Sequence, residues 1–157
     1  AALGYVPQPL LTAISYAAIP NIGAYSGQGL ANLAWSYSTL SDMDAPLRPA
    51  ISAQVMRSIS DFQMQHVANT AWAFANIDCL HRPGMEALAA AALRKISECN
   101  PQALANISWS WARLQLMDPP LLAAISSQAI RTMQEFQSQN VANTTWALAT
   151  LEYNDKP

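Results

Sequence analysis

Apolar residues recur at helical spacing in the segment from Pro120 to Phe136. Pro120 suits the first turn of a helix, and Asp118 just before it is a candidate N-cap. A second helical pattern follows over residues 139–151, and no alternating pattern typical of strands is present. The sequence therefore predicts two helices joined by a short turn. Four apolar residues share one face of the first helix: Leu121, Ile125, Ala129 and Met133.

This two-helix pattern returns every 37 residues, and no gap is needed to align the copies. A residue as rare as tryptophan, recurring four times in one register, indicates a true repeat. Columns of alanine and proline keep the same register. The three columns with the strongest signal are Gln28, Gln65, Gln102 and Gln139; Asn32, Asn69, Asn106 and Asn143; and Trp35, Trp72, Trp109 and Trp146.

The repeat predicts an all-α fold, an α-solenoid of tandem helix–turn–helix hairpins with a 37-residue period. Pro20 and the glycines after it predict a kinked or shortened first helix in the first unit. Because both ends fall inside the repeat register, we expect the native protein to be longer. The predicted units are 1–8 (the tail of a preceding repeat), 9–45 (irregular), 46–82, 83–119, 120–156, and 157 as the start of a further repeat.

The second helix of each unit carries two opposite stripes of residues, and both are suited to burial. In the first unit, one stripe holds Gln28, Asn32 and Trp35, and the opposite stripe holds Leu30 and Tyr37. A helix covered on both sides is buried, so we expect the tryptophans to pack between repeats and the asparagines to form a buried, hydrogen-bonded row. Tryptophan stacking on bases and asparagine reading of base edges are the alternatives. Positions identical in every repeat cannot encode a varied sequence.

Composition limits the classes of function. Hydrophobic residues make up 52% of the chain, charged residues 11%, and the net charge is −2, which is a weak basis for nucleic-acid binding. The longest apolar run, residues 87–93, is too short to span a membrane. We therefore expect no transmembrane segment in this chain.

Catalytic and metal-binding patterns are missing from the sequence. His66 and His81 lie at different repeat positions, and neither belongs to a recognisable catalytic motif. Cys79 and His81 are too few for a zinc site, and Cys79 with Cys99 makes no disulfide framework. No glycine-rich phosphate loop is present. We expect neither an enzyme nor a bound cofactor or metal.

A column of arginines marks the outer face of the first helix of three units. Stacked along a solenoid, these guanidinium groups would suit RNA phosphates. Each arginine also has an acid four residues later, which is ordinary for a helix surface and partly neutralises the column. The arginines are Arg57, Arg94 and Arg131, and the acids are Asp61, Glu98 and Glu135.

Other columns on the same helix face vary between units, as the columns of one-base-per-repeat RNA readers do. Alanine or proline fills several of these positions, so partial or degenerate recognition is the most that they predict. The candidate base-reading residues are Tyr16, Asn21, Ser58, Glu86, Lys95, Ser127 and Thr132.

The motif Gln-x-x-Ala-Asn-x-x-Trp-Ala-x-Ala-x-Leu carries a family resemblance. It stands at Gln65–Ile77 and Gln139–Leu151, with variants in the other two units. It resembles the octotricopeptide and heptatricopeptide repeats of organellar RNA-binding proteins. The resemblance implies a role in RNA processing, stabilisation, translation or ribosome assembly. It also implies single-stranded or ribosomal RNA as a partner, and an organellar location with the plastid slightly favoured over the mitochondrion.

The main hypothesis is RNA binding, with the first helix of each hairpin lining the concave surface. The alternative is a non-catalytic protein–protein scaffold or peripheral subunit of a large organellar complex, such as a ribosome or a photosynthetic or respiratory assembly. Low charge and net acidity favour the alternative, and so do the small residues on the free face.

Overall fold

The computed structural model describes residues 8–39, 46–77 and 81–152. These residues form helices and connecting turns without strands, which confirms the all-α class. The predictions for residues 1–7, for Cys79 and for Pro157 lie outside the described residues. The α-helices are α1 (Gln8–Ala18), α2 (Gly27–Thr39), α3 (Leu47–Ser58), α4 (Met64–Asn76), α5 (Arg82–Arg94), α6 (Pro101–Arg113), α7 (Pro119–Thr132) and α8 (Ser138–Thr150).

Side-chain caps begin several of these helices. The Asp118 carboxylate accepts a hydrogen bond from the Leu121 backbone N–H at 3.1 Å, which confirms the predicted N-cap of α7. Asn100 caps α6 in the same way, through a 2.8 Å bond to its Oδ1 from the Ala103 backbone N–H. His81 stands where other units have an acid, and its Nδ1 accepts from the backbone N–H of Gly84 at 3.1 Å.

A short 3-10 helix follows each odd-numbered helix. These are η1 (Ile19–Ala24), η2 (Ile59–Asp61), η3 (Ile96–Glu98) and η4 (Met133–Glu135). In the first unit α1 stops at Ala18, and Pro20 lies at the start of the longer η1. Proline cannot donate the backbone bond that an α-helix needs at this point. The predicted shortening of the first helix is therefore confirmed.

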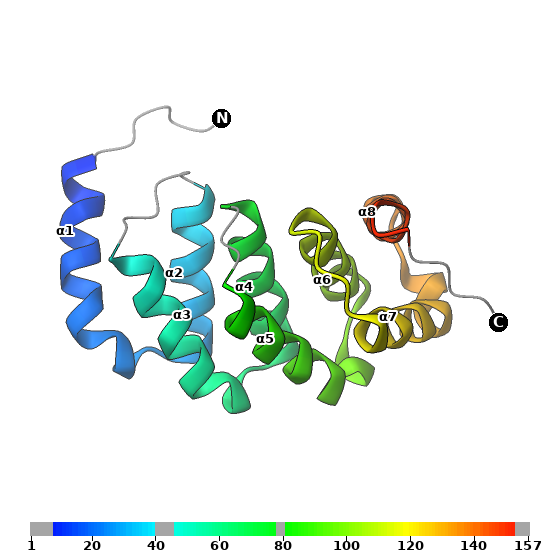
Figure 1. The fold of residues 1–157 in the computed structure, drawn as a ribbon, viewed down its shortest axis with the longest axis horizontal. Coiled ribbons are helices and arrows are strands. Elements are labelled where there is room, and N and C mark those ends of the chain that lie inside the picture. The colour runs from blue at the N-terminus through cyan, green and yellow to red at the C-terminus, as the bar shows by residue number, and fades with distance from the viewer. Residues whose placement is uncertain (1–7, 40–45, 78–80, 153–157) are drawn as a thin grey trace.

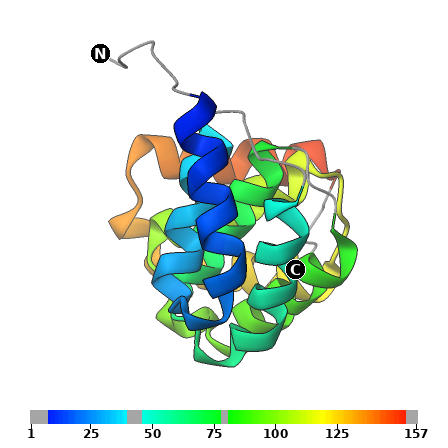
Figure 2. The same cartoon turned by 90° about the vertical axis from the view of Figure 1, so that its left-hand side faces the viewer.

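The helices form two rows (Figure 1), and the rows are packed differently. Neighbours in the even row, from α2 through α4 and α6 to α8, contact each other along much of their length, whereas the odd helices α1, α3, α5 and α7 meet at only a few points. In Figure 1 α2 runs vertically and α8 is seen end-on, so the helix direction rotates along the array. Viewed from the α1 end, the other helices follow behind α1 (Figure 2).

The closer packing of the even row determines which side of the array is concave. An array curves toward the row whose helices lie closer together, so the even helices line the inner side. The expectation that the first helix of each hairpin lines the concave surface is therefore wrong. The sequence period gave no measure of how close each row packs, because this depends on side-chain volume at the contacts.

Alanines allow the close approach within the even row. Ala31, Ala68 and Ala105 occupy one repeat column and are each 1% exposed. A methyl side chain lets two helix backbones approach more closely than a larger residue does. Ala142 fills the same column in α8, on the side away from α6, and it is exposed.

A continuous apolar core lies between the two rows. Its largest fully buried side chains come from both rows and include Leu47, Ile51, Phe74, Leu104 and Trp111. In the described part of the chain, every helix is too short or too polar to cross a membrane.

We predict that Ala105→Leu destabilises the protein by about 1–3 kcal/mol, because the added methylenes overpack the α6–α8 contact. Ala142→Leu is the matched control, since it makes the same change in the same column at an exposed position, and its effect should be within about 0.5 kcal/mol. Urea unfolding measures both. Equal destabilisation by the two variants would contradict the role given to the alanine column.

Candidate binding surface on the even helices

One stripe of each even helix faces solvent. Gln28, Gln65, Gln102 and Gln139 are all exposed, and the asparagine and tryptophan columns are exposed or half-buried. The prediction that this stripe is buried is therefore wrong. Neighbouring even helices pack on the two flanks of the stripe, with the alanine column on one of them, and leave the stripe itself open. We call this surface the ladder face: Gln28, Gln65, Gln102, Gln139, Asn32, Asn69, Asn106, Asn143, Trp35, Trp72, Trp109 and Trp146.

The four tryptophans of the ladder face pack against one another in sequence. Ring centroids are 6.4 Å apart between Trp35 and Trp72, 6.2 Å between Trp72 and Trp109, and 6.5 Å between Trp109 and Trp146. Rings at these distances stabilise each other in offset or tilted arrangements. The expected packing of tryptophans between repeats is confirmed. Trp35 and Trp146 nonetheless remain 48% and 46% exposed.

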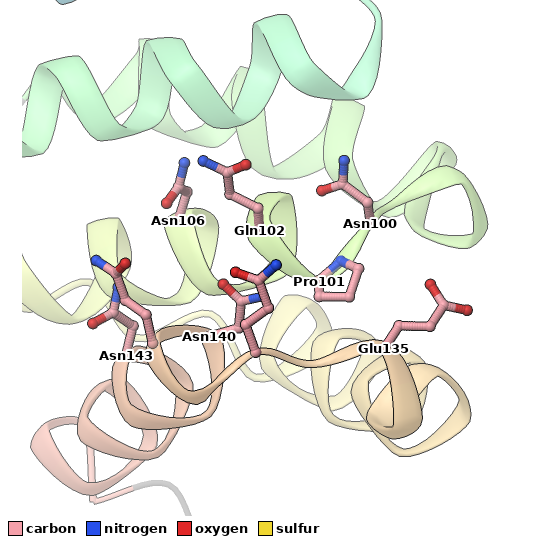
Figure 3. A pocket seen from close by; sticks show the side chains of 9 residues that line it. Asn100, Pro101, Gln102, Asn106, Glu135, Asn140 and Asn143 are labelled. Atoms are coloured by element: carbon pink, nitrogen blue, oxygen red, sulfur yellow. The ribbon is translucent and has the colours of Figure 1, made fainter.

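Two hollows run along the amide columns beside the tryptophans. The larger, of about 350 Å³, lies between α6 and α8, and its lining side chains come from these two helices and from the segments just before them (Figure 3). A smaller hollow of about 80 Å³ lies between α4 and α6. Amide side chains dominate the lining of both, and Glu135 is the one charged residue among the lining residues. Gln102, Asn106 and Asn100 line both hollows, while Asn140 and Asn143 complete the larger one.

The amides of these hollows have unused hydrogen-bonding capacity. The side chains of Gln102, Asn106, Asn140 and Asn143 make no hydrogen bond to another group in the described residues. Each amide offers two donors and an acceptor. The expectation of a buried, internally satisfied asparagine row is therefore wrong, because the side chains project from an open face. They are available to a ligand.

Part of this lining was not predicted from the sequence, although some of its residues recur at the repeat period. Gln63, Asn100 and Gln137 precede α4, α6 and α8, and they are spaced by 37 residues. This polar column was available as a signal, and Asn100 and Gln137 line the larger hollow. Asn140 could not have been found in this way, because its column holds other residue types in the other units.

The predicted phosphate-binding arginines lie on the other row. Arg57, Arg94 and Arg131 are exposed near the ends of α3, α5 and α7, away from the ladder face. The acids Asp61, Glu98 and Glu135, which follow them by four residues, are exposed as well. Phosphate binding by these arginines stays a prediction.

The seven candidate base readers lie on the odd row and its 3-10 helices, and four of them already use their polar groups within the chain. Ser58 and Thr132 donate to backbone oxygens of their own helices, at 2.8 and 3.0 Å. Asn21 Nδ2 donates to the Ala17 backbone oxygen at 3.1 Å, and Lys95 Nζ to that of Phe62 at 2.7 Å. The structure does not gather the candidates into one site. The other three are exposed: Tyr16, Glu86 and Ser127.

Comparison with known proteins identifies the family of this chain. Residues 17–157 match the family model described as RNA-editing substrate-binding complex 6 protein. The chain belongs to this family. A search of curated proteins gave no match. The resemblance to octotricopeptide and heptatricopeptide repeats is not tested by these comparisons and stays a prediction.

The free thiol of Cys99, the residue before Asn100, is buried in this RNA-editing substrate-binding complex 6 family member. Burial, with a smaller effect of Glu98, raises the pKa of Cys99 to about 12. The Cys99 thiol therefore stays protonated at neutral pH and is a poor nucleophile. In the described ranges, no group of three or more histidine, cysteine, aspartate or glutamate side chains could hold a metal ion.

His66 has a local structural role at the start of α4. Its Nδ1 accepts a hydrogen bond of 3.3 Å from the Gln63 backbone N–H, and its ring meets Phe62 edge-on at 5.9 Å. Burial and then the charge of Lys95 lower the pKa of His66 from its usual 6.5. The folded state therefore favours the neutral imidazole, whose free nitrogen can accept this bond.

We predict that protonation of His66 destabilises this protein. Because the folded-state pKa is the lower one, the stabilisation is complete above pH 6.5 and is lost as the pH falls from there through the lowered pKa. His66→Asn, which copies the residue of this column in α8, keeps an acceptor and should flatten the pH dependence. Thermal unfolding between about pH 5 and pH 8 of both proteins measures this. Parallel curves would contradict the assignment.

Proposed function

We propose that this protein is a non-catalytic scaffold subunit of an RNA-editing substrate-binding complex. The observation that carries the proposal is the family match over residues 17–157, which spans nearly all of the described helices. The alternative drawn from the sequence, a subunit of a large assembly, thereby gains more support than direct RNA recognition does.

The chemistry of the ladder face supports a binding role. Its amides neither gain nor lose protons near neutral pH, so they are suited to recognition rather than to proton transfer. Tryptophans that are half-exposed at the ends of the row are typical anchors of protein interfaces. The face combines both on closely packed helices, which hold the side chains in fixed positions.

We also infer that the chain is part of an α-solenoid with a 37-residue period and repeat units at 46–82, 83–119 and 120–156. Support comes from the even helices, which begin at Gly27, Met64, Pro101 and Ser138. These positions are 37 residues apart throughout. Solenoids present extended concave surfaces to partners, and here this is the surface of the even row. An octotricopeptide-like or heptatricopeptide-like origin of the repeat fits this arrangement.

Direct RNA contact is a second candidate function, and it concerns the odd row. The exposed arginines Arg57, Arg94 and Arg131 share one repeat position. Three cations at a common position can contact successive phosphates of single-stranded RNA. In a complex that handles RNA, the two rows would then serve different partners, with protein on the even row and RNA on the odd row.

The mitochondrion is the proposed compartment. RNA-editing complexes of this family are mitochondrial, which agrees with an organellar location but not with the preference for the plastid drawn from the sequence. The preference for the plastid is therefore wrong.

We predict that the intact protein, tagged and purified from its organelle, brings down other subunits of an RNA-editing complex even after nuclease treatment. Protein–protein contacts survive removal of RNA, whereas contacts bridged by RNA do not. Mass spectrometry identifies the co-purifying proteins, and sequencing of crosslinked RNA measures RNA contact in the same preparation. Loss of all partner proteins after nuclease treatment would contradict the scaffold function.

In this experiment, a charge-reversal variant distinguishes RNA binding by the odd row from protein binding by the even row. Arg57→Glu, Arg94→Glu and Arg131→Glu together should lower crosslinked RNA if the odd row contacts phosphates, and protein partners should be retained. Changing Asp61 and Glu98 to the matching amides is the control, because it alters charges beside the arginines and leaves Glu135, which lines the larger hollow of the ladder face, unchanged. Unchanged RNA crosslinking in the arginine variant removes the second candidate function and leaves the scaffold function in place.

A further inference from the structure

The ladder face combines three chemical features in parallel rows, and their combination indicates a class of partner. One row is made of tryptophans that pack against one another, and the other two are made of asparagine and glutamine amides. The rows run across four even helices, so a ligand that follows them must be long and narrow. An extended polymer chain has this shape.

The amide rows match the main chain of a peptide. A side-chain amide carries a carbonyl next to an N–H group, as a peptide unit does, so it can pair with the N–H and C=O of an extended chain. The amides of Asn106 and Asn143 make no hydrogen bond within the described residues, and both residues line the larger hollow (Figure 3). Pairing with a main chain does not depend on the side chains of the partner, which explains how an unvarying amide row can be useful.

The tryptophan row matches the repeat of an extended peptide. Successive residues of an extended chain advance by about 3.3 Å, so side chains on the same side recur about every 6.6 Å. The tryptophan rings recur at 6.2 to 6.5 Å. Alternate side chains of an extended peptide can therefore each meet one tryptophan, and four tryptophans correspond to about eight residues of peptide.

Charge favours a basic peptide over RNA on this face. The hollows are lined by neutral amides and Glu135, and neither has lysine or arginine in its lining. An RNA backbone in this place would leave its phosphates without counter-charges. Lysine and arginine side chains, by contrast, can lay their apolar stems along the exposed parts of the tryptophans while the cation stays in water, and the chain as a whole has a net charge of −2.

We propose that the ladder face binds an extended segment of a partner protein, with the peptide main chain on the amide rows and lysine or arginine side chains at alternate positions on the tryptophan row. This rests on the proposed function only in taking the ladder face as the surface that a partner meets. The partner presents an extended segment with basic side chains at alternate positions to this face.

Binding of synthetic peptides to the purified full chain tests this proposal. The probe is a fluorescein-labelled ten-residue peptide of alternating lysine and serine. Two comparison peptides replace every lysine by glutamate, or keep the composition with lysines in adjacent pairs. A ten-nucleotide oligouridine is the RNA comparison. Fluorescence anisotropy reports binding, and the tryptophan emission of the protein reports contact with the row.

The alternating lysine peptide should bind best and shift the tryptophan emission. The double variant Asn106→Ala with Asn143→Ala should weaken binding about tenfold, as expected for loss of two or three hydrogen bonds. Both asparagines are partly exposed, so the fold should persist, and circular dichroism checks this. Gln134→Ala is the matched control, because Gln134 is an exposed amide outside both hollows, and it should bind as the unchanged protein does.

Three results would overturn the proposal. They are equal binding by the double variant, no preference for the alternating peptide over the paired one, and tighter binding of oligouridine that the double variant weakens. Because the test uses the purified chain, it can fail while co-purification with an editing complex succeeds. If the peptide binds as expected but no subunits of an editing complex co-purify, the proposed function fails and the peptide-binding proposal stands.

Discussion

The close packing of the even helices along a column of alanines is the contact on which the rest of the structure depends. Ala31, Ala68 and Ala105 are almost completely buried in it. This contact brings the tryptophan rings within 6.2 to 6.5 Å of each other, curves the array toward the even row, and pushes the amide side chains out onto one continuous surface. Larger residues in this column would separate the helices and, with them, all three rows of the ladder face.

Local features of the fold could be predicted from the sequence because they depend on neighbouring residues. Asp118 caps α7, and Pro20 ends the first α-helix, for reasons that involve only a few backbone groups on either side. The 37-residue repeat likewise showed where pairs of helices recur. Such features do not require knowledge of how helices from different units meet.

The exposed surface could not be predicted in the same way. A helical wheel shows which residues share a face, but it does not show whether a neighbour contacts the centre of that face or its flanks. The stripe of Gln102, Asn106 and Trp109 was predicted to be buried because tryptophan usually packs against other side chains. The neighbouring helices in fact meet beside the stripe, at Ala105 and its equivalents. The curvature of the helix array could not be predicted either, because it depends on how much more closely one row packs than the other.

The identical amide columns of the even row limit the class of ligand that this row can recognise. A row that repeats the same side chain in every unit cannot distinguish one base sequence from another, and this weighs against sequence-specific RNA reading by Asn106 and its equivalents. The same uniformity suits a ligand that is itself uniform along its length. A peptide main chain has that property, since it presents the same donor and acceptor at every residue. Invariance between repeats is therefore compatible with a specific function when the recognised feature is a backbone, and any selectivity must then come from the side chains that meet the tryptophans.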